Sequence, residues 1–128
     1  MAKKSFKPTA KELEILQILW DKGPSSVRVV NESMGGEASN GYTTILKLMQ
    51  IMHEKGLVTR QKAGKLHLYK AVPSLEGTRQ HMLDKMIETV FRGSATQLVL
   101  SALGNKKSSR KEIEEIRKYL DKLERRKT

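Results

Sequence analysis

Residues 42–71 read YTTILKLMQIMHEKGLVTRQKAGKLHLYKA, and this run carries two structural signals in succession. Apolar residues recur at helical spacing from about Thr43 to Lys55, where a glycine ends the pattern. Two extended segments, Leu57–Lys62 and Leu66–Ala71, follow around the glycine at position 64. Their β-branched and aromatic side chains predict a β-hairpin. We therefore expect a helix that leads directly into a hairpin.

Two shorter helices are predicted before this run. The first begins at Thr9, whose hydroxyl can accept from the backbone near Glu12 while the Glu12 carboxylate reaches back, as in a capping box. It ends at Gly23. Ser25 or Ser26 can cap the second helix, and the segment from Ser25 to Val27 can also pair as a short strand. Three helices and then a hairpin are the order of a winged helix-turn-helix.

The predicted fold class is mainly α with a small β-hairpin, in two parts that meet at Pro73. Residues 1–72 form a winged-helix domain, which begins with a short basic arm, and residues 73–128 form a helical region. Apolar residues over 82–91 have helical spacing. The segment 98–103 is short enough to be helix or strand, but its cap and the flanking helices favour helix.

The composition points to a polyanionic partner. Lysine and arginine number 25 against 14 acidic residues, the formal net charge is +11, and the sequence pI is about 10.0. Phosphate neutralisation by such cations supplies much of nucleic-acid affinity. The alternative is a solubilising basic surface. There are no cysteines and no apolar run of the roughly 18 residues that span a bilayer, so we expect a cytoplasmic protein without disulfides.

The helix over 43–55 has two chemically different faces. At 100° per residue, four apolar residues point inward together, namely Ile45, Leu48, Met49 and Met52. The opposite face carries hydroxyl, ammonium, amide and carboxylate groups, on Thr43, Lys47, Gln50 and Glu54. Lysine can donate to guanine and glutamine can pair with the adenine edge, so this face suits the major groove. Taken alone, such a face is more often a solvated surface, but its place in a helix–helix–helix–hairpin order within a basic chain favours DNA reading.

Four further positions border this face. Leu46 and Ile51 are apolar, and either contact with thymine methyl groups or packing under the hairpin accounts for them. The Tyr42 hydroxyl can hold a phosphate. Thr44 can cap the helix or bind a phosphate.

Cations at the hairpin extend the candidate DNA surface. Lys62 and Lys65 flank the glycine at the tip, where they can straddle a minor-groove phosphate row, and Arg60 can extend that contact. Arg28, early in the second helix, is a weaker candidate for a phosphate contact. A charged hairpin tip is also an ordinary solvated turn.

No pattern in the sequence points to catalysis. The three histidines, His53, His67 and His81, lie on different predicted elements without a metal-ligand partner at useful spacing. No nucleophile elbow, phosphate-binding glycine loop or zinc motif is present. We therefore expect no enzyme activity, no cofactor and no metal.

The segments PTAKELEILQILW, GPSSVRVV, GYTTILKLMQIMHEKGLV and GKLHLYKA resemble the penicillinase-repressor (BlaI/MecI) family. The tail, including QLVLSAL and the last amphipathic helix, is similar in length and pattern. The resemblance implies a homodimer that binds double-stranded DNA at a palindromic operator and blocks transcription. It also implies that the third helix enters the major groove and that the C-terminal helices exchange between subunits.

On this resemblance, the apolar stripes after Pro73 form the dimer surface. The residues concerned are Leu83, Met86, Ile87, Leu98, Leu100, Leu103, Ile113, Ile116 and Leu120. The alternative is packing within one chain, but three short helices make a poor core by themselves.

Three features depart from patterns found in the family. Members that respond to β-lactams are cleaved by a membrane sensor protease, commonly at an asparagine–phenylalanine pair, and the corresponding pair here is Ser101-Ala102. Many relatives also have arginine at the position of Ile51, so one polar contact is absent. Copper-responsive relatives use C-terminal cysteines, which this chain lacks.

Two other functions fit parts of the sequence. A winged helix can serve as a protein–protein assembly module, in which the third helix docks on a partner protein. It can also serve as an architectural protein that binds DNA without sequence preference. A polar reading face beside a basic hairpin argues against the first, and unequal binding of operator and random DNA would exclude the second.

Overall fold

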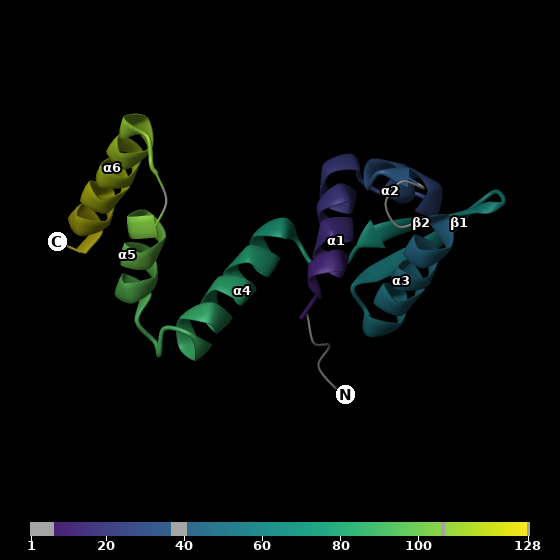
Figure 1. The fold of residues 1–128 in the computed structure, drawn as a ribbon, viewed down its shortest axis with the longest axis horizontal. Coiled ribbons are helices and arrows are strands. Elements are labelled where there is room, and N and C mark those ends of the chain that lie inside the picture. Colours follow the sequence, from purple (N-terminus) through teal and green to yellow (C-terminus); the bar gives the residue numbers. More distant parts are fainter. Residues whose placement is uncertain (1–6, 37–40, 106, 128) are drawn as a thin grey trace. The chain divides into compact units, whose positions relative to one another are not determined.

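The computed structural model describes residues 7–36, 41–105 and 107–127. Its elements, shown in Figure 1, are α1 (Ala10–Lys22), α2 (Val27–Ser33), α3 (Tyr42–Lys55), β1 (Val58–Ala63), β2 (Leu66–Ala71), α4 (Leu75–Thr89), α5 (Ala95–Asn105) and α6 (Arg110–Lys127). The predicted order of three helices, a hairpin and a helical region is confirmed. Most of the predicted N-terminal arm lies outside the described residues, as do positions 37–40 of the connection before α3.

Helix α1 begins and ends as its sequence predicts. The Thr9 hydroxyl accepts from the Glu12 amide at 3.2 Å, and the Glu12 carboxylate accepts from the Thr9 amide at 3.0 Å. Gly23 ends the helix with φ +82°, a conformation that favours glycine, and its N–H donates to the Leu19 carbonyl at 2.8 Å. Local side-chain chemistry therefore fixes both ends of α1.

The two serines between α1 and α2 have different roles. Ser26 is the cap of α2, since its hydroxyl accepts from the Val29 amide at 3.3 Å. Ser25 instead forms a single β-bridge with Tyr69, with N···O distances of 3.0 and 2.8 Å. The short strand expected from Ser25 to Val27 is therefore one residue long, because Val27 already begins α2.

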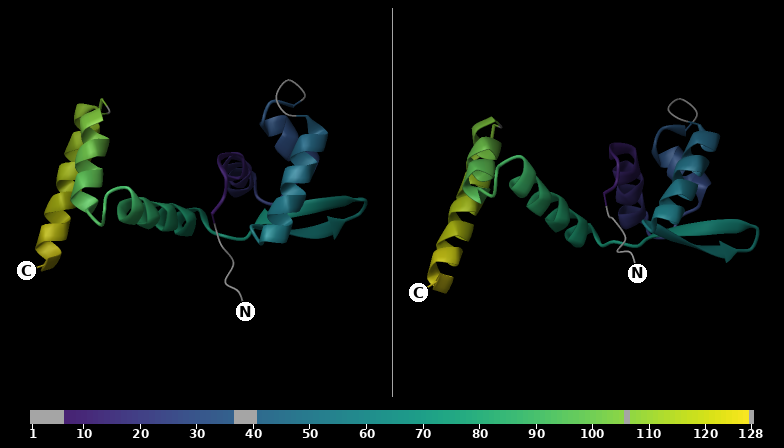
Figure 2. Two further views of the ribbon diagram at one scale, coloured as in Figure 1. Left: turned by 60° about the horizontal axis from the view of Figure 1, so that its bottom comes forward. Right: turned by 90° about the horizontal axis from the view of Figure 1, so that it is seen from below.

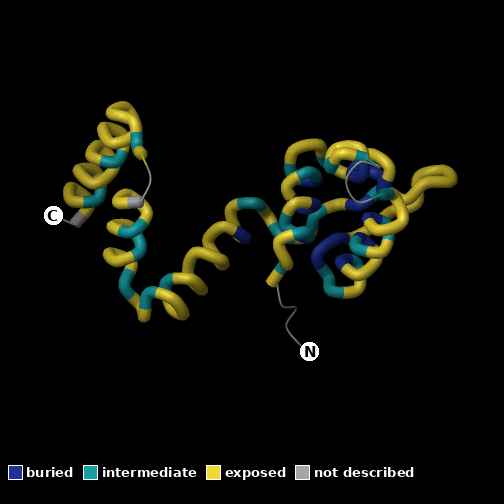
Figure 3. Tube along the Cα trace, in the orientation of Figure 1, coloured by how far each residue is buried: buried dark blue, intermediate teal, exposed yellow. Residues whose placement is uncertain are grey.

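The hydrophobic core lies among α1, α2, α3 and the base of the hairpin. Its buried members are Ile15, Leu16, Leu19, Val27, Val30, Ile45, Met49, Met52, Leu57, Val58 and Tyr69. Figure 3 shows these buried positions gathered within this part of the chain. Each of the three helices contributes one apolar face, so the core fixes the orientation of α3 relative to the hairpin.

The hairpin turns over two residues, Gly64 and Lys65. Ala63 pairs with Leu66 as the last rung of the antiparallel ladder, so the first strand ends one residue later than the predicted segment Leu57–Lys62. Gly64 has φ +66°, and a positive φ at the first turn position alone is typical of a type II′ turn. This turn matches the twist of the two strands, which project beyond the helices of their unit (Figure 2).

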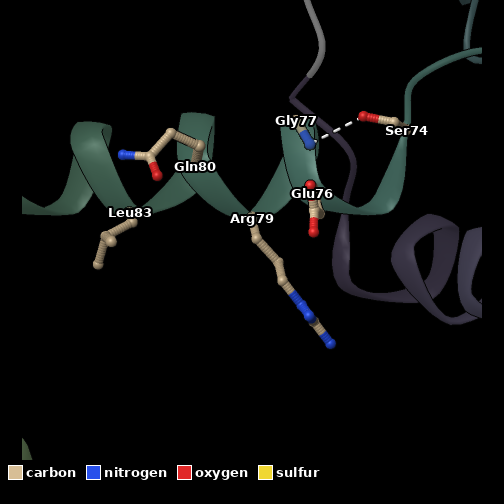
Figure 4. Close-up of a pocket in the computed structure, with 6 residues that line it drawn as sticks. All are labelled: Ser74, Glu76, Gly77, Arg79, Gln80 and Leu83. Atoms are coloured by element: carbon tan, nitrogen blue, oxygen red, sulfur yellow. Dashed lines mark hydrogen bonds between the residues drawn. The ribbon is translucent and has the colours of Figure 1, made fainter. Parts of the chain in front are cut away.

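The chain divides into two compact units, residues 1–83 and residues 84–128. The first turns of α4 belong to the first unit: the Trp20 indole N–H donates to the Pro73 carbonyl at 2.9 Å, and Thr78 is buried. Figure 4 shows the Ser74 hydroxyl accepting from the Gly77 amide at 2.9 Å. A Cβ on Gly77 would lie 2.8 Å from that hydroxyl, so glycine leaves room for the cap.

Serine caps also open the last two helices. The Ser94 hydroxyl accepts from the Gln97 amide at 3.0 Å, and α5 is a helix, as its cap predicted. Ser109 and Glu112 form a capping box at the start of α6, with both hydrogen bonds at 3.1 Å. Beyond Thr78, no residue whose exposure is described is buried. None of the described helices has the length and apolar character needed to cross a membrane.

Candidate nucleic-acid interface

The two faces of α3 are separated as predicted. Ile45, Met49 and Met52 are fully buried, and Leu48 packs against the same core. On the opposite side, four polar residues are exposed, namely Thr43, Lys47, Gln50 and Glu54. The inner face anchors α3 to the domain, and the outer face presents donors and acceptors to a ligand.

Among the described residues, no side chain caps the N-terminus of α3. The N-cap position is Gly41, with φ +86°, and no side chain of the described residues bonds to the first turn from there. Thr44 lies in the first turn rather than at the cap, so the capping role considered for it is wrong. The amides at a helix N-terminus carry partial positive charge, which attracts a phosphate.

A hollow of about 150 Å³ lies between the N-terminal ends of α2 and α3 and the tip of the hairpin. Its lining residues are Ser26, Val27, Arg28, Tyr42, Leu46, Lys65, Leu66, His67 and Tyr69. Three predicted phosphate-binding residues from three elements, Arg28, Tyr42 and Lys65, thus come together. Two cationic side chains and a phenol around one small hollow can hold a phosphate oxygen.

His67 also lines this hollow, although sequence analysis gave it no role. Its place depends on the strand register, in which Lys62 pairs with His67 and Arg60 pairs with Tyr69. Directly paired residues share a face of the sheet, so Arg60 and Lys62 lie on the face whose base is covered by the core. Lys70 pairs with Thr59 and lies on the other face.

The two apolar residues that border the reading face have different surroundings. Leu46 is half-buried, packs against the core and lines the hollow with Leu66, so packing under the hairpin accounts for it. Ile51 is 38% exposed. The structure therefore decides the alternatives for Leu46 only.

A buried ion pair joins the start of α1 to the end of α3. Glu12 is 2% exposed, and its two oxygens accept from the Lys55 Nζ at 2.8 and 3.0 Å. Burial raises the pKa of Glu12, but the Lys55 ammonium and the Thr9 hydrogen bonds outweigh it and hold the pKa below its ordinary value. Sequence analysis identified Glu12 only as a cap, because its partner is 43 positions away.

Potential metal ligands do not cluster among the described residues. No group of three or more histidine, cysteine, aspartate or glutamate side chains among them could hold a metal ion. The three histidines lie apart, on α3, β2 and α4.

The sequence model of the penicillinase repressor family matches residues 8–122. This chain belongs to the penicillinase repressor family. It is 26% identical over 122 residues to the methicillin resistance regulatory protein MecI of Mammaliicoccus sciuri, covering 95% of this chain and 99% of that one. It is 22% identical over 123 residues to the penicillinase repressor of Staphylococcus aureus, covering 96% of this chain and 98% of that one.

The fold is also similar to that of a MarR family protein from Bacillus stearothermophilus. The TM-score is 0.52 at 21% identity, covering 94% of this chain and 76% of that chain. The resemblance to the penicillinase repressor family and the winged-helix fold class are thereby confirmed. The family consists of DNA-binding transcription regulators rather than enzymes.

The apolar residues proposed for the dimer surface of this family member are largely exposed in the single chain. Leu83, Met86, Leu100, Leu103, Ile113 and Leu120 are exposed, and Ile87, Leu98 and Ile116 are half-buried. Val99 and Tyr119, which sequence analysis left out, are 47% and 59% exposed. These helices therefore have apolar area that their own chain does not cover.

The pair that corresponds to the family's cleavage position lies inside a helix. Ser101 and Ala102 are in α5, with Ser101 half-buried and Ala102 exposed. Proteases act preferentially at exposed, extended segments. Cleavage between these residues therefore requires local opening of α5.

Proposed function

We propose that this protein is a dimeric, sequence-specific transcriptional repressor that binds a palindromic DNA operator. Helix α3 enters the major groove, and the hairpin acts as a wing on neighbouring phosphates. The observation that carries the proposal is the exposed polar face of α3, on Thr43, Lys47 and Gln50, next to the hollow lined by Arg28, Tyr42 and Lys65. The net charge of +11 supports a polyanionic partner.

In this proposal the two parts of the chain have separate tasks. Residues 1–72 bind DNA, and residues 73–128 hold two subunits together through the apolar stripes of α4, α5 and α6. A palindromic site matches the two-fold symmetry of such a dimer. Sensor-protease cleavage at Ser101-Ala102 has little support, since serine and alanine stand where the β-lactam-responsive members commonly have asparagine and phenylalanine.

Substitutions on α3 test the reading face. Lys47→Ala or Gln50→Ala is expected to weaken operator binding by roughly 1–3 kcal/mol, because each removes a base contact, while binding to random DNA changes much less. The measurement is a titration of labelled operator and random duplexes at one salt concentration. Lys22→Ala and Gln17→Ala, exposed on α1, are the matched controls. Unchanged operator affinity for both α3 variants would show that the face does not read bases.

A substitution on the wing tests phosphate binding. Lys65→Ala is expected to weaken operator and random DNA alike and to reduce the slope of log affinity against log salt by about 1. The reason is that Lys65 lines the hollow at the hairpin tip rather than the reading face. If Lys65→Ala weakened binding to the operator but not to random DNA, this role would be contradicted. If the wild type bound operator and random DNA equally well, an architectural protein would be favoured instead.

A further inference from the structure

We propose that Ile51 contacts the C5 methyl group of a thymine in the major groove and so determines one base of the operator. The inference rests on the proposed function, because it assumes that α3 reads DNA. It adds an apolar contact to a face otherwise made of polar groups.

The first step is that Ile51 is exposed on α3 although it is a large apolar residue. The other apolar residues at the edges of the reading face, Leu46 and Leu48, both pack against the core. Ile51 is instead an exposed large apolar side chain, at 38%. Single exposed apolar side chains are common on protein surfaces, so the position of Ile51 on α3 decides its role.

The second step is position along α3. Lys47 and Ile51 are four residues apart, so they lie about 40° apart around the helix and about 6 Å apart along it. Gln50 lies on the other side of Lys47. If Lys47 and Gln50 reach base edges, Ile51 therefore faces the same groove about one turn further along.

The third step is chemistry. The thymine methyl is the one apolar group that a base pair presents in the major groove, where the other groups are donors and acceptors. A branched aliphatic side chain cannot hydrogen-bond to guanine, adenine or cytosine, and it gains nothing beside a phosphate. Thymine is therefore the base whose edge Ile51 can recognise.

Replacing single thymines by deoxyuridine tests the contact, because this change removes the methyl group and keeps the base pair. A selected operator is synthesised with deoxyuridine at each thymine in turn, and affinities are measured. We expect one thymine per half-site at which the change weakens wild-type binding about fourfold, the effect of burying one methyl group. Ile51→Ala should bind the unmodified operator at least about fourfold more weakly and should not distinguish thymine from uracil there.

Val72→Ala is the control, since Val72 is an aliphatic residue 46% exposed in the same unit and outside the reading face. Val72→Ala should lose the same amount of affinity as the wild type when that thymine is replaced by deoxyuridine. The proposal is overturned if Ile51→Ala loses as much affinity as the wild type when that thymine is replaced by deoxyuridine. It is also overturned if the protein prefers its operator but no thymine lies beneath α3, or if replacing the thymines there leaves the affinity unchanged. In those cases the proposed function stands. Absence of any operator preference would instead overturn the proposed function and this inference with it.

Discussion

Lys55→Met is expected to lower the free energy of unfolding by about 3 kcal/mol, a large part of the stability of a small domain. The variant removes the cationic partner of the Glu12 carboxylate, which is 2% exposed and accepts from Lys55 at 2.8 and 3.0 Å. A buried carboxylate without its counter-charge is costly. The loss lies at the lower end of the usual range because the Lys55 side chain is 36% exposed, which weakens the pair.

Replacing Glu12 is expected to lower the free energy of unfolding less than replacing Lys55 does. Glu12→Gln leaves the partly exposed Lys55 ammonium to water and keeps a side-chain oxygen for the cap, so it should cost about 1 kcal/mol. Urea unfolding, followed by the fluorescence of Trp20, the single tryptophan, measures both variants. Lys11→Met is the control, because Lys11 pairs with Glu14 only at 3.9 Å on the surface. Equal losses for Lys55→Met and Lys11→Met would contradict the assignment.

The ion pair of Glu12 and Lys55 also makes the stability of the folded protein depend on pH. Because the folded protein holds the pKa of Glu12 below its ordinary value, the stabilisation is complete above the ordinary carboxyl range. It is lost as the pH falls through the lowered pKa of the folded state. Wild-type stability should therefore decline below about pH 4 more steeply than that of Glu12→Gln. Parallel curves would show that Glu12 contributes nothing to the acid sensitivity.

Features specified by neighbours in the sequence were predictable. The caps at Thr9, Ser94 and Ser109 each need only residues three positions away, and all three form. The two faces of α3 follow from helical periodicity alone, which is why the burial of Ile45 and Met49 was predicted correctly.

Features that depend on distant parts of the chain were not predictable. Glu12 and Lys55 carry no spacing signal, and only the packing of α1 against α3 brings them together. His67 lines the hollow because of the hairpin register, in which it pairs with Lys62. The turn has two residues, one fewer than the predicted segments leave between the strands. The two alternatives for Leu46, contact with a thymine methyl group and packing under the hairpin, could likewise be separated only once the position of the hairpin was known. The sequence does not show which side of a helix another element covers.

Leu120→Asp is expected to convert the dimer into monomers and to weaken operator binding about 100-fold or more, since two linked half-site contacts become separate events. Leu120 is 54% exposed and shares a stripe of α6 with Ile113 and Ile116. A substitution on an exposed surface normally changes stability by less than about 0.5 kcal/mol. A large effect at Leu120 therefore requires a second subunit to cover it.

The control is Lys118→Asp, on the opposite face of the same helix. It changes the charge more than Leu120→Asp does, so a general effect of charge would affect it at least as strongly. Sedimentation at micromolar concentration should show a dimer for Lys118→Asp and for the wild type, and a monomer for Leu120→Asp. A monomeric wild type that still binds its operator tightly would contradict the dimer. The exposed apolar stripes would then need another partner, because no residue beyond Thr78 with described exposure is buried by the chain itself.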